Sequence, residues 1–178
     1  MAFDTYLNID GIKGESTDDK HKDWIEVLSF SHGMSQPTSS TKSSAGGAST
    51  GRVTHQPFQI VKFLDAASPK LYEAISGGKH FSKIKIEVCR AGGSQVKFLE
   101  ITMEEVMVSE IHLHTGGSNG SPATTTENLP KEHGDLLPTE TVSLNYGKIE
   151  WVYTQQKRKD GSGGGNVTAK YDLTAGKS

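Results

Sequence analysis

Two histidines two positions apart, His112 and His114, are the residues whose types and spacing come nearest to a metal site. On a strand this spacing places both imidazoles on one face, and His133 is available downstream as a third ligand. The pair borders a stretch rich in Gly, Ser and Thr, without an Asp, Glu or His at a defined spacing to complete the ligand set. A solvent-exposed strand end is therefore the preferred interpretation, and a metal site is the alternative.

The other reactive side chains do not form a recognisable catalytic set. Cys89 alternates with apolar neighbours and has no activating partner nearby in the sequence, so it is interpreted as a small packed residue. Glu104 and Glu105 are adjacent and point to opposite faces of a strand, which is poor geometry for paired acid and base catalysis. The segment 46–52 has the glycine spacing of a phosphate-binding loop, but Arg52 stands where that motif needs lysine. We predict no enzyme activity, no cofactor and no bound metal.

Composition and charge narrow the classes of protein further. The chain has 178 residues, with 19 Lys and Arg against 21 Asp and Glu, and a formal net charge of −2. A nucleic-acid-binding domain normally carries a basic excess, so no nucleic acid is expected as a partner. No apolar run approaches the roughly 18 residues that span a bilayer, so no membrane insertion is expected. The first residues carry Asp4 and lack an apolar signal-peptide core, and the lone cysteine suits a reducing cytoplasm.

Alternating apolar residues predict a mainly β domain. The period-2 pattern is clearest in Phe3–Ile9, where one parity is apolar and the other is largely polar. Further strands are predicted over 24–32, 58–64, 84–89, 96–113, 142–153 and 167–173, with a turn over 157–165. The total is seven to nine strands.

One short helix is predicted to lie beside the strands. Ser68 is a suitable N-cap, and Pro69 fits the first helical position because its missing N–H would be unpaired there. Gly77–Gly78 supplies a left-handed stop. Leu71 and Ile75, four positions apart, give the helix a single apolar stripe that should pack against a sheet.

The apolar parity of two long strands changes partway along. It shifts between Met103 and Val106, and again between Tyr146 and Ile149 across Gly147. One inserted residue at each place, a β-bulge, would produce such a shift. Because bulges bend strands, we expect a barrel or a strongly coiled sandwich instead of a flat sheet.

Two polar segments interrupt an otherwise single domain over 1–178. In 35–51, 14 of 17 residues are Ser, Thr, Gly or Ala, a composition too poor in apolar area to form a core of its own. The second polar segment, 115–139, contains three prolines. Both are expected to be loops.

The strongest indication of function comes from short strings spread along the chain. They are AFDTYLNIDGIKGES at 2–16, SHGMS at 31–35, ASP at 67–69, GKHF at 78–81, RAGG at 90–93, VMVS at 106–109 and VSLNYGKIEWVY at 142–153. Their order and approximate spacing resemble those of the haemolysin-coregulated protein family, Hcp. The resemblance extends from residue 2 to about residue 173.

The resemblance implies a two-sheet β-barrel with one flanking helix, similar to the tail-tube proteins of contractile phages. Such subunits form hexameric rings, which stack into the inner tube of a type VI secretion machine. The implied partners are further copies of the chain, a spike at the tube tip, the surrounding sheath and small effector cargo. The implied location is the cytoplasm before firing, followed by export through the machine without a signal peptide. The alternatives are a phage tail-tube subunit and a monomeric β-barrel that binds a small ligand or a metal.

The resemblance also assigns roles to particular positions. Leu28 and Phe30 are expected to face the core, which leaves Ser29 and Ser31 on the opposite side as candidate residues of the lumen that face cargo. The alternative is that both serines lie on a solvent-exposed strand face without a role in cargo binding. The segment 35–51 matches the loop that reaches toward the next ring in the family. The candidate ring-stacking residues are Ser35, Thr38, Lys42, Gly46, Gly47 and Arg52.

The sequence departs from the family pattern in two places. The segment 115–139 is longer than the usual connection, and Tyr171 stands where relatives more often have tryptophan. Both differences bear on the contacts between rings. The chain also ends soon after the last predicted strand, so no appended toxin domain is expected.

Overall fold

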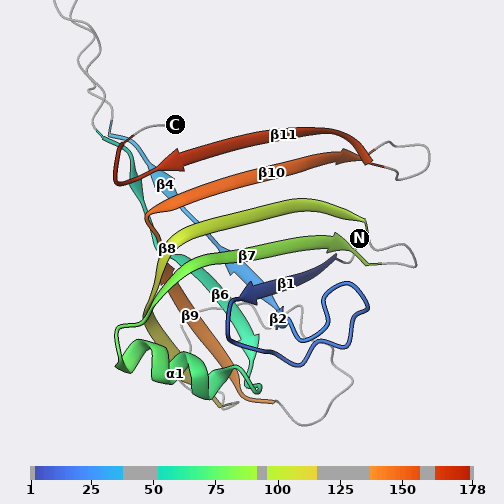
Figure 1. Cartoon of the computed structure of the whole chain (residues 1–178), viewed down its shortest axis with the longest axis vertical. Helices are drawn as coiled ribbons and strands as arrows, with labels where there is room; N and C mark the ends of the chain where they lie inside the picture. Colours follow the sequence, from blue (N-terminus) through green and yellow to red (C-terminus); the bar gives the residue numbers. More distant parts are fainter. Residues whose placement is uncertain (1–2, 38–51, 92–95, 116–136, 157–162, 177–178) are drawn as a thin grey trace, which may run out of the picture.

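The structure is a computed structural model that describes residues 3–37, 52–91, 96–115, 137–156 and 163–176 (Figure 1). Two curved layers of strands cross one another, and a single short helix lies at one end of the molecule. The described elements are β1 (Phe3–Ile9), β2 (Ile25–Val27), β3 (Ser29–Ser31), β4 (Met34–Ser35), β5 (Thr54–His55), β6 (Phe58–Phe63), α1 (Ser68–Ser76), β7 (His80–Arg90), β8 (Lys97–His114), β9 (Thr139–Asn145), β10 (Lys148–Gln156) and β11 (Gly163–Asp172).

The strands form one nine-stranded sheet and a separate pair, β4–β5, within the described part of the chain. The main sheet runs β2-β1-β7-β8-β9-β6-β3. Its longest strand, β8, has 18 residues and two successive partners on one side, β10 along its first half and β9 along its second. Because β10 continues to β11 whereas β9 continues to β6, the sheet divides into the two layers that cross in Figure 1.

The predicted mainly β class is confirmed, but the sheet does not close into a barrel. β2 and β3 lie at opposite ends of the strand order, although they are neighbours in the sequence. β2 pairs with β1 and β3 pairs with β6, and the N–H of Leu28 between them donates to the carbonyl of Val61 at 2.8 Å. The two ends of the sheet, β2 and β3, are therefore joined by the chain through Leu28 and not by strand pairing.

This crossing overturns one prediction about the core. Phe30 is half-buried and stacks on Phe58 with ring centroids 5.6 Å apart, as expected. Leu28 was expected to be buried, but it is 37% exposed, while Val27 is buried. The reason is that 24–32 is two short strands with different partners, and the inward parity breaks between them.

The parity shifts in the long strands are real, but the predicted β-bulges are wrong. Phe81 pairs with Val106 and Lys83 pairs with Glu104, so no residue is inserted between β7 and β8. Glu105 has φ 56, in the left-handed region that side chains rarely occupy. The buried residues on either side of this corner are Phe81 and Ile84 in β7, Met103 and Val106 in β8, and Tyr146 and Ile149 around Gly147.

These pairs show that β7, β8 and the segment that joins β9 to β10 shift their inward face together. The sheet therefore turns a corner without losing register. The register shifts lie elsewhere, between Val88 and Cys89 and between Val108 and Glu110.

The helix α1 has nine residues, and no described helix is long and apolar enough to cross a bilayer. Gly78 has φ +62 and supplies the predicted left-handed stop. Leu71 is buried and Ile75 packs against the core, which confirms the apolar stripe. Ser68 was expected to cap the helix, but it is the first helical residue and makes no cap hydrogen bond.

Ser68 instead belongs to a buried polar network that fixes α1 on the sheet. The ammonium of Lys62 donates to Ser68 Oγ at 2.9 Å and to Glu140 Oε2 at 2.9 Å, and it lies 2.8 Å from Asp65 Oδ1. Lys62, Ser68 and Glu140 are all fully buried. Buried charges of this kind persist only when they are paired and hydrogen-bonded, so these contacts specify how α1, β6 and β9 fit together.

Tyr72 completes the network from the helix by donating a short hydrogen bond to Glu140 Oε1. Burial, together with the bond to Glu140, raises the pKa of Tyr72 to about 12. Burial by itself would raise the pKa of Glu140, but bonds from Tyr72, Ser68 and Lys62 hold that pKa below its ordinary value. Glu140 is therefore a carboxylate at neutral pH.

Candidate functional site

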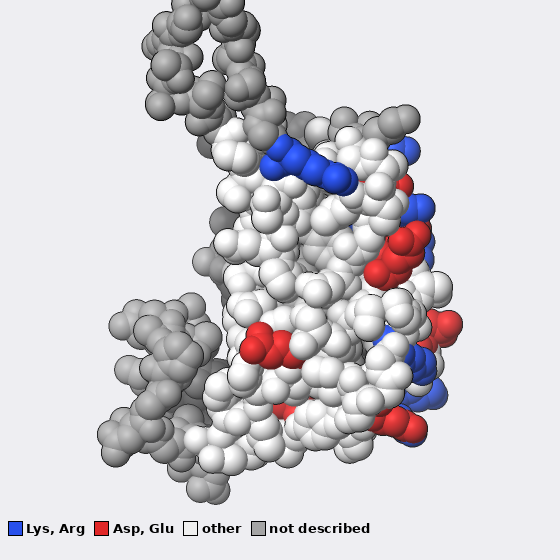
Figure 2. Space-filling view, turned by 90° about the vertical axis from the view of Figure 1, so that its left-hand side faces the viewer, with Lys and Arg blue, Asp and Glu red and all other residues white. Residues whose placement is uncertain are grey.

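One face of the β7–β8–β10–β11 layer carries charges of alternating sign, and we call it the charged face. Strand register places Lys83, Glu104, Lys148 and Asp172 in one row across the four strands, and Lys85, Thr102, Glu150 and Lys170 in the next. Red and blue residues alternate along one edge of the molecule in Figure 2, whereas the side that faces the viewer is mostly uncharged. Opposite charges in adjacent strands offset one another, so this face is polar without a strong net charge.

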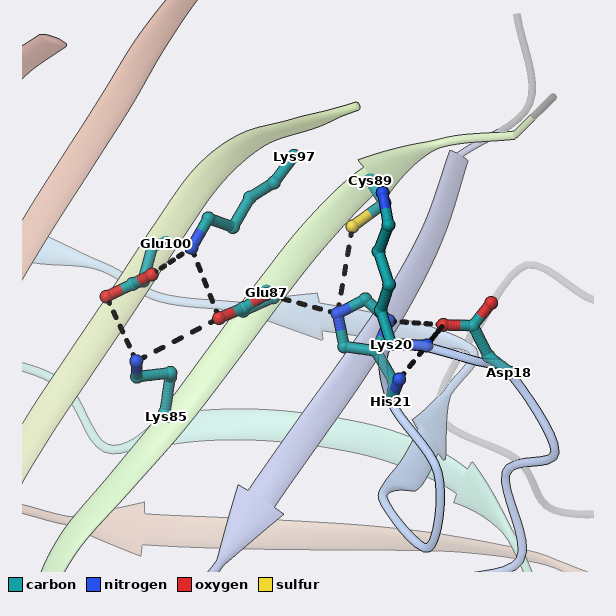
Figure 3. Close-up of polar contacts among 8 residues, drawn as sticks. All are labelled: Asp18, Lys20, His21, Lys85, Glu87, Cys89, Lys97 and Glu100. Atoms are coloured by element: carbon teal, nitrogen blue, oxygen red, sulfur yellow. Dashed lines mark hydrogen bonds and ion pairs between the residues drawn. The ribbon is translucent and has the colours of Figure 1, made fainter. Parts of the chain in front are cut away.

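The ion pairs on the charged face are numerous and individually weak. Lys85 lies 3.4 Å from Glu100 and Lys97 lies 3.2 Å from Glu87, and Lys97 also makes a short contact with Glu100 (Figure 3). Partly exposed pairs contribute about 0–1 kcal/mol each. Burial would raise the pKa of Glu100, but Lys97 and Lys85 hold it below the ordinary value.

His21 joins the loop after β1 to this face. Its Nδ1 lies 2.6 Å from Asp18 Oδ1 and its Nε2 lies 3.1 Å from Glu87 Oε2 (Figure 3). The ring stacks on Tyr6 with centroids 4.1 Å apart. Contacts on both nitrogens and on one ring face fix the imidazole in place, so His21 holds the loop after β1 against β7.

Cys89 lies next to His21, with its Sγ 4.0 Å from His21 Nε2. It is buried, as expected for a packed residue. Burial and the nearby Glu87 carboxylate raise the pKa of the Cys89 thiol to about 11. The thiol is therefore protonated and unreactive at neutral pH.

A groove of about 430 Å³ lies between the charged rows of β8, β10 and β11. Its Asp172 carboxylate accepts bonds from the hydroxyl and the N–H of Thr174, which lower the pKa of Asp172 and tie it into the turn after β11. The groove is lined by Thr102, Glu104, Lys148, Ile149, Glu150, Lys170, Tyr171 and Asp172. Lysines and carboxylates are mixed along it, a composition that favours contact with a polar surface over recognition of one charged ligand.

The outer side of β3, β6 and β9 is different, and we call it the hydroxyl face. Ser31 pairs with Gln59, which pairs with Ser143, and the Gln59 amide donates to Ser143 Oγ at 3.3 Å. In the next row, Ser29 pairs with Val61, which pairs with Thr141. These rows consist of short hydroxyl, amide and aliphatic side chains.

Ser29 and Ser31 are both exposed on β3 at the edge of the hydroxyl face. Their proposed contact with cargo remains a prediction. Gln59, Thr141 and Ser143 lie on the same face, and no motif in the sequence marks them. The alternation in 58–64 places Gln59 on the outer face of its strand. The sequence does not show that Thr141 and Ser143 lie beside it, because β6 and β9 are neighbours only through long-range pairing.

The candidate stacking residues are partly described. Ser35 is exposed in β4, and β4 pairs with β5 through Met34 with His55 and Ser35 with Thr54. Arg52 is exposed and donates to the carbonyl of Leu173 at 2.6 Å. Thr38, Lys42, Gly46 and Gly47 lie outside the described residues, as does most of 115–139.

The histidines of the metal-site alternative are at the exposed end of β8. His112 Nε2 lies 2.8 Å from Glu110 Oε1, and His114 Nε2 lies 3.4 Å from Thr141 Oγ1. His133 falls in the undescribed segment 116–136. Among the described residues, no three or more His, Cys, Asp or Glu side chains are grouped to hold a metal ion.

β11 is a long and largely exposed strand. Within the described part of the chain it pairs only with β10, and residues 165–170 are exposed, so its outer backbone groups form a free sheet edge there. Val167 is 66% exposed and pairs with Tyr153 of β10, which is 48% exposed. A long edge strand with exposed backbone groups and an exposed apolar pair beside them is a template for pairing with another chain.

These features define a β protein whose exposed edge and contrasting polar faces suit assembly more than catalysis. Residues 6–153 match the family described as "Type VI secretion system effector, Hcp", and the chain therefore belongs to the Hcp family of the type VI secretion system.

Individual relatives agree with this assignment. The chain is 37% identical to "Protein hcp1" of Pseudomonas aeruginosa over 97% of this chain and 96% of that protein. It is 27% identical to the "Major exported protein" of the same organism over 86% and 90% of the two chains. A solved structure described as that of a type six secretion system protein superposes with a TM-score of 0.82 at 32% identity, covering 99% of both chains.

Proposed function

We propose that this chain is the tube subunit of a type VI secretion machine, in which six copies form a ring and rings stack into a tube. The observation that carries the proposal is the free edge of β11. A ring needs a head-to-tail contact that closes after a fixed number of steps, and an unpaired strand edge supplies the backbone half of such a contact. Membership of the Hcp family supports the same role.

The apolar residues beside that edge support a lateral seam between neighbouring copies. Tyr153 and Val167 expose apolar area next to unpaired backbone groups. Burying a valine side chain contributes about 1.5–3 kcal/mol. A neighbouring copy that covers both residues therefore adds apolar burial to the free energy of association that the strand hydrogen bonds provide. The seam therefore combines strand pairing with apolar burial.

The hydroxyl face is assigned to the lumen. Ser29, Ser31 and Thr141 offer hydrogen bonds without fixed charge, and Glu110 of β8 adds a carboxylate at the border of the face beside Ser143, so a protein effector can be held there weakly. The charged face is then assigned to the outside of the tube, toward the sheath. Mixed lysine and carboxylate rows permit polar contacts there that salt screens, which keeps them reversible.

The segment 35–51 is assigned to contacts between stacked rings. β4 and β5 hold its two ends together, and Arg52 anchors the second end to the chain after β11. The tube tip then contacts a spike protein. The subunit is made in the cytoplasm and is exported through the machine that it builds, which agrees with the printed name "Major exported protein" of one relative.

Electron microscopy of the purified chain tests this proposal. Round particles with a central hole, some of them stacked end to end, are the expected result. A field of small solid particles at every protein concentration would contradict it. A phage-type tube subunit would give the same rings, and genes for sheath and spike beside the coding sequence separate the two machines.

A further inference from the structure

Three side chains from distant parts of the chain meet where β4–β5 rests on the sheet corner, and we call them the histidine junction. His32 follows β3, His55 lies in β5 and Tyr146 lies between β9 and β10. The Tyr146 hydroxyl lies 2.5 Å from His32 Nε2 and 2.9 Å from His55 Nδ1. The two imidazole centroids are 5.8 Å apart.

Aromatic rings surround the junction. His32 stacks on Phe58 with centroids 5.5 Å apart and lies 6.0 Å from Trp151. His55 stacks on Tyr171 of β11 at 5.0 Å. Tyr146 itself is buried. A site of this composition favours neutral imidazoles, because burial in aromatic surroundings penalises charge.

The hydrogen bonds also disfavour protonation of both rings at once. A phenol has one O–H to donate and accepts through its oxygen, so it can bridge one imidazole that accepts and one that donates. When both rings are protonated, each presents only donors, and the Tyr146 proton loses its acceptor. Two positive charges would also lie in rings whose centroids are 5.8 Å apart.

The pKa directions agree with the geometry. Burial lowers the pKa of both imidazoles, and the charge of His55 lowers that of His32 further. The ordinary histidine value is 6.5. Since the folded pKa values are depressed, the junction contributes its full stability above about pH 6.5 and loses it as the pH falls through the folded values.

The junction links the two contacts assigned above to assembly. His55 is in β5, at the base of the segment 35–51, while Tyr171 is in the edge strand β11. Arg52 adds a second link through the carbonyl of Leu173, just after β11. Releasing β4–β5 from the corner therefore disturbs the stacking segment directly.

We propose that the histidine junction is a proton-operated latch for ring stacking: protonation of His32 and His55 releases β4–β5 from the β9–β10 corner and separates stacked rings. The latch rests on the proposed tube function. It confines intact stacks to neutral surroundings and lets them come apart in a mildly acidic one.

The local event is testable on the protein whether or not it stacks. Trp151 lies beside His32, and the other tryptophan, Trp24, lies 5.0 Å from His21 and would add its own signal. In a Trp24→Phe background, we expect Trp151 fluorescence to change as the pH falls from about 7.5 to about 5. Hydrogen-exchange protection at 52–56, taken relative to the intrinsic exchange rate at each pH, should fall at least tenfold over the same range.

Two variants and a control decide the assignment. The double variant His32→Gln/His55→Gln removes titration and should abolish both pH responses, while Tyr146→Phe should accelerate exchange at 52–56 already at neutral pH. His112→Gln/His114→Gln, which changes exposed histidines elsewhere, should behave as the unmodified chain. Equal pH responses with and without His32 and His55, or unchanged protection at 52–56 at low pH, would overturn the latch.

Microscopy separates the latch from the tube proposal. Single rings that persist at about pH 5 while stacks disappear support both proposals. Stacks that survive at that pH overturn the latch and leave the tube subunit intact. An absence of rings at every pH contradicts the tube proposal, and the fluorescence and exchange results still decide the local event.

Discussion

Replacing Lys62 by methionine should destabilise the fold strongly, because it leaves a buried carboxylate without its cation. Lys62 and Glu140 are both fully buried, with Nζ and Oε2 2.9 Å apart. Removing one partner of a buried pair costs about 3–5 kcal/mol. The remaining bonds from Ser68 and Tyr72 to Glu140 place Lys62→Met toward the lower end of that range.

A double-mutant cycle isolates the pair. Lys62→Met/Glu140→Met removes both charges, and we expect it to recover about 2 kcal/mol or more of the loss, since apolar replacements of buried pairs are often nearly neutral. The assay is urea unfolding at neutral pH and fixed protein concentration, because assembly shifts apparent stability. Lys70→Met is the matched control: Lys70 pairs with Glu73 on the exposed side of the same helix, and its loss should barely move the midpoint.

Two outcomes would refute this reasoning. A loss below about 1 kcal/mol for Lys62→Met would mean that water solvates the carboxylate. Strict additivity of the single changes would mean that the two groups do not interact. The pH dependence gives a further check: the folded pKa of Glu140 is depressed below 4.5, so the contribution of Glu140 is complete above about pH 4.5 and falls as acid titrates the folded state.

The remaining predictions concern assembly and the backbone. Val167→Lys should weaken association about tenfold or more, measured by the concentration dependence of mass, whereas Thr168→Lys on the opposite face of β11 should not; equal effects would argue against the seam. Ser31→Gln should lower effector retention in a pull-down at unchanged ring mass, and unaltered retention would remove Ser31 from the cargo surface. Gly14→Ala should lower the unfolding midpoint because its Cβ would lie 2.4 Å from the Trp24 carbonyl oxygen, while Gly165→Ala has open space and should be tolerated.

Local sequence signals predicted the strands with a clear apolar alternation and the helix with clear start and stop residues. Phe3–Ile9 is a strand with the bounds that its period-2 pattern predicts. The helix lies where Pro69 and Gly78 place it. In these segments turn chemistry and burial pattern agree, so tertiary contacts do not override the local preference.

The errors came from long-range partners. Leu28 is exposed because its neighbours belong to strands with different partners, and no local pattern encodes that change. Ser68 has the right type for a cap, but the buried charges of Lys62 and Glu140 recruit its hydroxyl. β11 begins at Gly163, ahead of the predicted residue 167, because pairing with β10 extends it through glycines.

The same limit explains what was missed among the functional surfaces. The histidine junction joins His32, His55 and Tyr146, which are up to 114 positions apart in the sequence. The rows of the hydroxyl face likewise exist only through the pairing of β3, β6 and β9. Single residues such as Ser31 were found from parity, whereas their neighbours needed the register.

The most direct measurement of the central claim is the mass of the purified chain in solution. One chain weighs 19.2 kDa, so a ring of six weighs six times 19.2 kDa, about 115 kDa. Light scattering at micromolar concentration should give the mass of six chains or a multiple of it. A mass that stays at that of one chain as the concentration rises would contradict the account.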